Sequence, residues 1–246
     1  TLNDILDAPF ASDLTVSKDG KQIAWVEYVA GERNIFLGSG SEFKTVRQLT
    51  HYTGDEGVSI SNLAFVGDGS RLIFVRGNSR NRQGEPANPA LLQENTEDTI
   101  FIMSLNSDKL TKISAGTAPK ISNTGTLMTF SKGGQVWLAD LTNSNFESRQ
   151  LFQLRGNQSD IKWSPDDHQI AFRSSRGDHA FIGIYDFNTR QVKFLAPSVD
   201  LDFSPEWSPD GQSIAFIRKP NALEVPPFTP QKVGHPWSII RYDLES

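Results

Sequence analysis

The 246-residue sequence has no cysteine and no long apolar run. Without cysteine there is no disulfide framework, no thiolate metal site and no cysteine nucleophile. The apolar runs are only a few residues long, whereas a helix needs about 20 apolar residues to cross a bilayer. We therefore expect no membrane partner.

Charge of one sign is not concentrated anywhere in the chain. The sequence has 29 acidic and 24 basic residues, a net charge of −5, and neither sign forms a block. A nucleic-acid-binding surface needs clustered basic residues to neutralise phosphates. We therefore expect no nucleic-acid partner.

Signals for catalysis and for metal binding are also missing. The sequence contains no GxSxG nucleophile motif and no glycine-rich phosphate loop. Its four histidines lie on separate segments without HxH or HExxH spacing: His51, His168, His179 and His235. The sequence therefore predicts no metal, no cofactor and no catalytic residue within this chain.

What the sequence does contain is an internal repeat. Five segments align on a turn, at Gly20, Gly69, Gly125, Asp167 and Gly211, which are 49, 56, 42 and 44 residues apart. This spacing is typical of a propeller blade of four strands. The repeats, numbered 1 to 5, cover approximately residues 12–50, 58–114, 117–155, 158–197 and 200–246.

Three columns of the alignment are apolar in every repeat. They stand four residues before the turn position (Val16, Phe65, Ile121, Trp163, Trp207), three after it (Ile23, Leu72, Met128, Ile170, Ile214) and five after it (Trp25, Phe74, Phe130, Phe172, Phe216). The second and third columns are two residues apart, which places both on one face of a strand. The first column should lie on equivalent first strands.

The turn chemistry predicts how the first two strands pair. In Ser208-Pro209-Asp210-Gly211, proline presets the first corner, Asp bonds its own backbone, and Gly accepts a positive φ. Such a turn makes strands one and two antiparallel neighbours. A third apolar run follows in every repeat and a fourth in repeats 1 to 4. The fold class is therefore an all-β propeller of four-stranded antiparallel blades, with about five blades and an incomplete ring.

Candidate binding residues lie on the loops at one end of the repeats. Long insertions at 77–98 and 218–236 are typical of a binding face; the alternative is that they are tolerated surface insertions or contacts with a further domain. Asp55 and Glu56 could receive a substrate amino group, with a solvated loop as the alternative. Arg176 and Asp178, in the loop at 174–179, are further candidates that ordinary turn chemistry would also explain.

Several segments resemble a known family. They are WSPDGQSIAF (207–216) with its variant at 163–172, SSRGDHAFIGIYDF (174–187), the opening at 2–27, and HPWSIIRYDL (235–244). Together they resemble the N-terminal propeller of bacterial prolyl oligopeptidase-type serine peptidases, in the acylaminoacyl- and dipeptidyl-peptidase-like branch. The core repeat is also similar to that of TolB-like periplasmic propellers.

The resemblance implies a function. In this family the propeller is non-catalytic and gates and orients oligopeptide substrates for a C-terminal α/β-hydrolase domain of the same chain. It implies a peptide substrate and a periplasmic or secreted bacterial protein. The adjacent Glu-Glu pair that dipeptidyl-peptidase IV relatives use for the substrate amine does not occur here. The alternative is a free-standing TolB-like propeller that binds another protein. In either case, unpaired blade edges could allow self-association.

Overall fold

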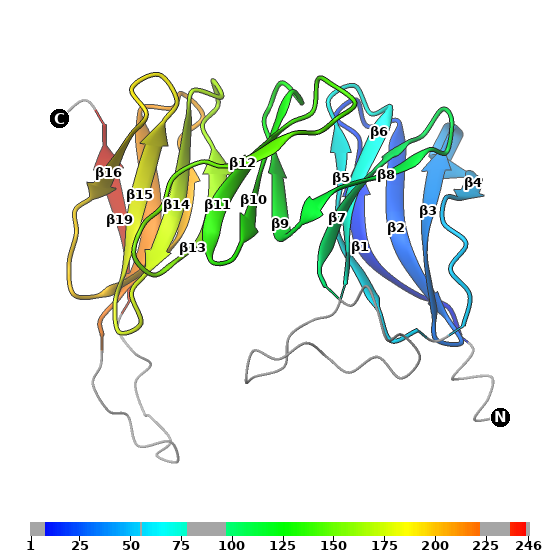
Figure 1. Ribbon diagram of the computed structural model, residues 1–246, viewed down its shortest axis with the longest axis horizontal. Coiled ribbons are helices and arrows are strands. Elements are labelled where there is room, and N and C mark those ends of the chain that lie inside the picture. The colour runs from blue at the N-terminus through cyan, green and yellow to red at the C-terminus, as the bar shows by residue number, and fades with distance from the viewer. Residues whose placement is uncertain (1–7, 55, 78–96, 222–236, 245–246) are drawn as a thin grey trace, which may run out of the picture. The chain divides into compact units, whose positions relative to one another are not determined.

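The computed structural model describes residues 8–54, 56–77, 97–221 and 237–244 (Figure 1). These residues form strands, turns and one short 3-10 helix, η1 (Ser41–Phe43). Within the described part of the chain, no helix is long and apolar enough to cross a membrane. The expected all-β fold class is confirmed.

Repeats 1 and 2 each form one antiparallel sheet whose strands follow sequence order. The strands of repeat 1 are β1 (Phe10–Val16), β2 (Gln22–Val29), β3 (Glu32–Ser39) and β4 (Thr45–Gln48). Those of repeat 2 are β5 (Ser59–Val66), β6 (Arg71–Gly77), β7 (Thr99–Ser104) and β8 (Leu110–Ala115).

Repeat 3 forms a third four-stranded sheet, in the order β12-β11-β10-β9. Its strands are β9 (Thr117–Ile121), β10 (Leu127–Lys132), β11 (Gln135–Asp140) and β12 (Ser148–Gln150).

Repeats 4 and 5 share a seven-stranded sheet. Repeat 4 supplies β13 (Asn157–Trp163), β14 (Gln169–Ser175), β15 (Ala180–Asp186) and β16 (Gln191–Leu195). Repeat 5 supplies β17 (Leu201–Trp207), β18 (Ser213–Lys219) and β19 (Ser238–Asp243). A single parallel pairing, between Ala180 and Leu201, joins the two antiparallel sets of strands.

The chain divides into two compact regions. The N-terminal region comprises Thr1–Ile121, Gly125–Lys132 and Ala139–Ser148; the C-terminal region comprises Ser122–Thr124, Gly133–Leu138 and Arg149–Ser246. The incomplete ring stays a prediction.

The predicted columns occupy equivalent places in all five repeats. Each first-column residue lies in the first strand and pairs directly with the second-column residue of the next strand: Val16 with Ile23, Phe65 with Leu72, Ile121 with Met128, Trp163 with Ile170, and Trp207 with Ile214. The placement of the first column on equivalent strands is confirmed.

The columns differ in how deeply their side chains are buried. The third-column phenylalanines Phe74, Phe130, Phe172 and Phe216 are at most 1% exposed. The first column is less buried than a core position: Trp207 is only partly buried, and Val16 is 53% exposed. The Trp207 indole Nε1 donates a hydrogen bond of 3.1 Å to the carbonyl of Lys162. The Trp207 ring therefore covers the neighbouring strand β13 while one edge stays in solvent.

Each first strand also carries a β-bulge that the sequence did not indicate. Seven residues before each turn position, a residue other than glycine has φ between 50° and 57°; these are Asp13, Asn62, Ala118, Asp160 and Ser204. The strand register shifts at the same places. Because Ala118 occupies this place in repeat 3, where the other repeats have Asp, Asn or Ser, the repeated bulge belongs to the sheet architecture rather than to one residue type.

The turns between first and second strands form as their residues predict. In repeat 5 the Ser208 hydroxyl donates to the Asp210 carboxylate at 2.5 Å and accepts from the Ser213 amide at 2.9 Å. Gly211 has φ of 73°, and its amide donates to the Ser208 carbonyl. The turns that begin at Ser17 and Ser164 repeat these bonds.

Candidate functional site

The candidate binding loops are only partly within the described residues. Most of the insertion at 77–98 and most of that at 218–236 lie outside them, as does Asp55. The site is therefore built from the described residues at the end of the repeats from which these loops leave, where the second strands finish and the first strands begin.

In the N-terminal region, Glu56 is engaged by an arginine. Its carboxylate forms an ion pair with Arg76, at the end of β6, and the two side chains are 28% and 15% exposed. The Arg76 guanidinium also lies over the Tyr52 ring, 4.1 Å from its centroid. An incoming ammonium group would have to compete with a fixed, partly buried guanidinium for Glu56.

Tyr52 completes this cluster. Burial raises the pKa of its hydroxyl, an effect that the nearby Arg76 charge opposes. The phenol therefore stays protonated at neutral pH. The backbone of Tyr52 is held by Asn34, whose side-chain nitrogen donates to the Tyr52 carbonyl and whose oxygen accepts from the Tyr52 amide. The described part of the link between repeats 1 and 2 thus holds Tyr52, Glu56 and Arg76 in one fixed cluster.

In the C-terminal region, the equivalent position carries a buried ion pair. Arg218, near the end of β18, donates from Nε and from one terminal nitrogen to the two carboxylate oxygens of Asp202, at 2.7 and 2.8 Å. Asp202 is fully buried and the Arg218 side chain is 17% exposed. Arg218 also donates to the Ala196 carbonyl at 2.6 Å, which ties the link between repeats 4 and 5 to β18.

The surroundings of Arg218 favour its charged form. The hydrogen bond that Arg218 donates to Asp202 is the largest of the effects that raise the pKa of Arg218, and burial opposes it. The guanidinium is therefore permanently protonated. A bidentate pair of this kind is a structural anchor, because breaking it would leave an uncompensated buried charge.

Repeat 4 has neutral residues where repeat 5 has that ion pair. Gln158 and Ser174 are register partners, as Asp202 and Arg218 are. The Gln158 amide nitrogen donates to the carbonyls of Arg155 and Gly156, whereas Gln158 Oε1 and Ser174 Oγ are buried with no hydrogen-bond partner. This end of repeat 4 therefore has unused hydrogen-bonding capacity.

Arg176 and Asp178 lie in the loop beside these residues. The Arg176 guanidinium is 5.9 Å from the centroid of Phe181 and 5.7 Å from that of Phe194. Asp178 is 2.6 Å from the His179 ring, and this hydrogen bond is the main reason that the pKa of Asp178 lies below its ordinary value. The structure thus places both candidates on one loop, where Asp178 is exposed and Arg176 is partly buried with its guanidinium near two aromatic rings.

The arrangement supports recognition better than bond-breaking. Catalysis of acyl transfer needs a nucleophile, an orienting base and an oxyanion site in contact. Within each region, the described residues place arginines beside carboxylates or aromatic rings, and no group of three potential metal ligands occurs among the described residues. Arg76, Tyr52, Asp202 and Arg218 were not singled out in the sequence, since their partners are 16 or more residues away.

Comparisons with known proteins show a TolB-like β-propeller fold. No protein-family model and no curated protein matches the chain. Among solved structures, TolB from Acinetobacter baumannii has a TM-score of 0.54 and 21% identity, over 87% of this chain and 52% of that one.

Two peptidase structures are also similar. A prolyl endopeptidase has a TM-score of 0.62 at 11% identity, over 97% of this chain and 37% of its own. A puromycin-hydrolyzing peptidase of Mycobacterium tuberculosis has a TM-score of 0.64 at 13% identity, and the match covers 96% of this chain and 36% of the peptidase. The chain therefore spans about half or less of the length of these relatives.

Proposed function

We propose that this chain is the non-catalytic propeller domain of a serine peptidase, which gates and orients oligopeptides for an α/β-hydrolase domain of the same polypeptide. The main support is the similarity of nearly the whole chain to parts of two peptidases. The described part of the candidate site agrees with this role, because it offers charged and aromatic groups for binding and no reacting centre is found among those residues. A periplasmic or secreted location is part of the same proposal.

The coding region downstream of Ser246 provides the first test. A strand-GxSxG-helix segment followed by Asp and His would support the proposal. A stop codon after one or two further blades would contradict it. Purified chain 1–246 should hydrolyse neither peptides nor esters, and turnover blocked by a serine-reactive inhibitor would overturn the non-catalytic role.

The loop at 174–179 provides a second test, made in the full-length polypeptide. Arg176→Ala should raise KM for oligopeptides several-fold and leave the hydrolysis of a small ester unchanged, because only a peptide long enough to reach the propeller would contact Arg176. Arg149→Ala, on the exposed strand β12, is the matched control. Equal effects of Arg176→Ala on both substrates would contradict a role in substrate selection.

A free-standing TolB-like propeller that binds another protein is the second candidate. The observation that favours it is the similarity to TolB at 21% identity, which is higher than the identity to either peptidase. The downstream sequence separates the two candidates. A stop codon is expected for a free-standing propeller, and a hydrolase domain is expected for the peptidase.

A further inference from the structure

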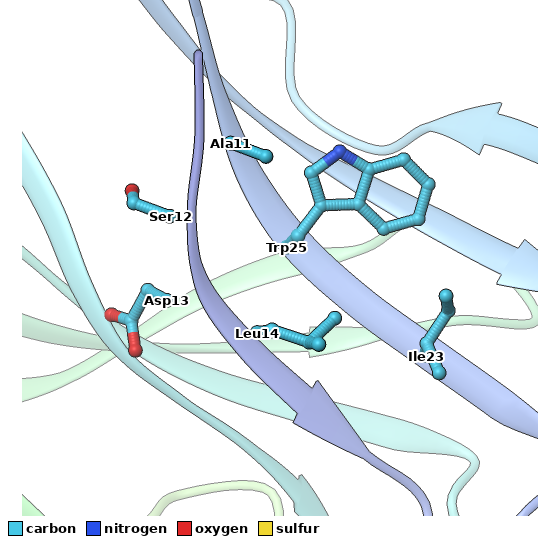
Figure 2. A pocket seen from close by; sticks show the side chains of 6 residues that line it. All are labelled: Ala11, Ser12, Asp13, Leu14, Ile23 and Trp25. Atoms are coloured by element: carbon cyan, nitrogen blue, oxygen red, sulfur yellow. The ribbon is translucent and has the colours of Figure 1, made fainter.

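Two hollows of the N-terminal region differ in the side chains that line them. One, of about 380 Å³, lies on repeat 1 against Ile23 and Trp25. Figure 2 shows that its acidic residue, Asp13, lies across β1 from these apolar side chains. The equivalent residues of repeat 2, Leu72 and Phe74, are fully buried, so this side of a sheet is one on which another repeat packs. It is therefore a packing face rather than a ligand site.

The second hollow, of about 130 Å³, lies between the sheet of repeat 2 and the β11–β12 loop of repeat 3. Two cationic side chains line it, those of Arg71 and Lys109, together with the apolar side chains of Ile102 and Phe146. No carboxylate is among its described lining residues, all of which belong to the N-terminal region. Arg71 begins β6, whereas Arg76 lies near the end of the same strand, so this hollow and the Glu56 cluster are at opposite ends of repeat 2. We call this hollow the basic pocket.

The strand register of repeat 2 forms the floor of the basic pocket. Arg71 of β6 pairs with Ser104 of β7, and Ile102 of β7 pairs with Thr111 of β8. Register partners lie on one side of a sheet, as do residues two apart along a strand, so these four side chains share one side. The Ser104 amide donates to the Lys109 carbonyl at 3.0 Å, which brings Lys109 to the edge of the same floor. The pairing of the strands thus gathers cations and hydroxyls around Ile102.

The β11–β12 loop forms the wall of the basic pocket. Ser144 and Phe146 reach the pocket from this loop. Arg71 Nη1 donates to the Leu141 carbonyl at 2.8 Å, and the Asn143 side-chain oxygen accepts from the Phe146 amide at 3.1 Å. These bonds hold the loop against repeat 2. Because a guanidinium has several N–H donors, the bond to Leu141 leaves donors of Arg71 for a ligand.

The carboxylates nearest in sequence to the two cations are engaged by other groups. Asp108 forms an ion pair with the arginine of β4, at 2.5 Å. Asp68 accepts from the Ser70 hydroxyl at 2.6 Å and from the Ser70 amide at 2.9 Å. These bonds are the main reason that the pKa of Asp68 lies below its ordinary value, and the Arg71 charge contributes less. The net positive charge of the lining therefore favours an anionic ligand.

The volume and the walls of the basic pocket select among anions. A cavity of about 150 Å³ holds one benzene molecule, so the basic pocket has room for a single ring or a short branched chain. A carboxylate suits the guanidinium and the ammonium, and an attached apolar group would cover Ile102 and Phe146. Inorganic phosphate would leave these two apolar side chains uncovered. The lining therefore fits an organic carboxylate better than inorganic phosphate.

We propose that the basic pocket binds a small organic carboxylate that carries one apolar group, of the size of a leucine side chain or of one ring. Its carboxylate accepts hydrogen bonds from Arg71 and Lys109, and its apolar group lies against Ile102 and Phe146. The same chemistry occurs in a free organic acid and in the C-terminal residue of a polypeptide. This binding is independent of the peptidase and TolB-like roles proposed above.

The test uses chain 1–246 and four small molecules. Benzoate and 3-methylbutanoate are titrated while the amide resonances of the protein are followed by NMR, and dissociation constants of about 0.1–1 mM are expected for ligands of this size. Benzamide, which has the ring without the charge, and inorganic phosphate should each bind at least about tenfold more weakly. Equally tight binding of benzamide or of phosphate would overturn the proposal, and so would a failure of both acids to bind.

Two variants and a matched control locate the ligand. Lys109→Gln changes an exposed residue, so it should fold, and it should weaken the binding of both acids by about tenfold. Phe146→Ala removes the apolar wall and should weaken benzoate binding several-fold. Lys112→Gln should leave binding unchanged, because Lys112 follows Thr111 on β8, points to the other side of the sheet and pairs with Glu97 at 3.2 Å. Binding that Lys109→Gln leaves unchanged, or that Lys112→Gln weakens as much, would overturn the proposal.

N-acetyl-leucine and N-acetyl-leucinamide distinguish the two sources of the carboxylate. N-acetyl-leucine presents the carboxylate and side chain of a C-terminal residue, and the amide lacks only the charge. If N-acetyl-leucine binds at least as tightly as 3-methylbutanoate and the amide does not bind, the basic pocket accepts the end of a polypeptide. If benzoate and 3-methylbutanoate bind and N-acetyl-leucine does not, the ligand is a free acid. Both results support carboxylate recognition, whereas an amide that binds as tightly as the acid would overturn it.

Discussion

Repeats 1 and 4 use the same aromatic column in different surroundings. Phe172 of repeat 4 is fully buried, with its ring 4.9 Å from that of Phe152 and packed on Gly183 of β15. Trp25, its equivalent in repeat 1, is partly buried and stacks on Phe36 at 5.9 Å. The strand pattern therefore determines which face a residue occupies, and the neighbouring sheet determines how much that residue stabilises the fold.

The largest expected effect comes from Phe172. Phe172→Ala should lower the free energy of unfolding by about 3–5 kcal/mol, because it leaves a cavity between packed strands. Trp25→Ala should cost less than about 2 kcal/mol, since Trp25 is only partly buried and less apolar area is lost from contact. Denaturant unfolding of both variants measures the difference. Equal losses of unfolding free energy would mean that the side of the sheet that carries Trp25 is covered as fully as the side that carries Phe172.

An intermediate effect is expected at Trp207. Trp207→Ala should cost about 2 kcal/mol, from lost apolar contact and from the hydrogen bond to the Lys162 carbonyl. Trp207→Phe keeps most of the contact and removes the hydrogen bond, so it should recover more than half of the loss. A loss as large as that of Phe172→Ala would show that the indole is a core side chain.

The turns of repeats 1 and 4 differ in their hydrogen bonds. Repeat 1 has Gly20 at the turn position, with φ of 70° and no atom within 4 Å of an added Cβ. Repeat 4 has Asp167 there with φ of 60°. The Asp167 carboxylate accepts from the amide of Asn123 at 2.7 Å and from that of Thr124 at 2.8 Å. In repeat 4, a less favourable backbone conformation is thus offset by bonds to the preceding turn.

Asp167→Ala should therefore cost about 1.5–3 kcal/mol, because it removes a charged acceptor from two amides. Asp167→Asn keeps one acceptor oxygen and the tolerance for positive φ, so its loss should be about half as large. Gly20→Ala should cost only about 1–2 kcal/mol, from backbone strain alone. Thermal unfolding measures both variants. If Gly20→Ala lowers stability more than Asp167→Ala does, the hydrogen bonds that Asp167 accepts from the preceding turn contribute little to stability.

The sequence predicted the fold better than the site. The columns around Trp25, Phe172 and Trp207 identify strands because alternation is a local property of the chain. Four of the five bulge residues are Asp, Asn or Ser and the fifth is Ala118. Short polar residues are also common in turns, so their identity alone does not mark a bulge in the sequence. Glu56 was selected for its carboxylate, but its partner Arg76 is 20 residues away and becomes visible only when the strands pair.

The smallest expected effect concerns acid, and it tests whether the turns of repeats 1 and 4 behave alike. The pKa of Asp19 and that of Asp166 both lie below the ordinary value of 3.8, mainly because the Ser17 and Ser164 hydroxyls donate to them. A carboxyl whose pKa is lowered by folding stabilises the fold above its ordinary pKa and loses that contribution as pH falls through the lower, folded-state pKa. Stability should therefore decline below about pH 4.

Ser17→Ala and Ser164→Ala should each raise the pKa of the neighbouring Asp and make this decline shallower. Carboxyl-carbon NMR titration of both variants measures the pKa directly, and an unchanged Asp19 pKa in Ser17→Ala would refute the assigned cause. A shift at Asp166 without one at Asp19 would show that the two turns differ electrostatically, although the Ser hydroxyl donates to the Asp carboxylate in both.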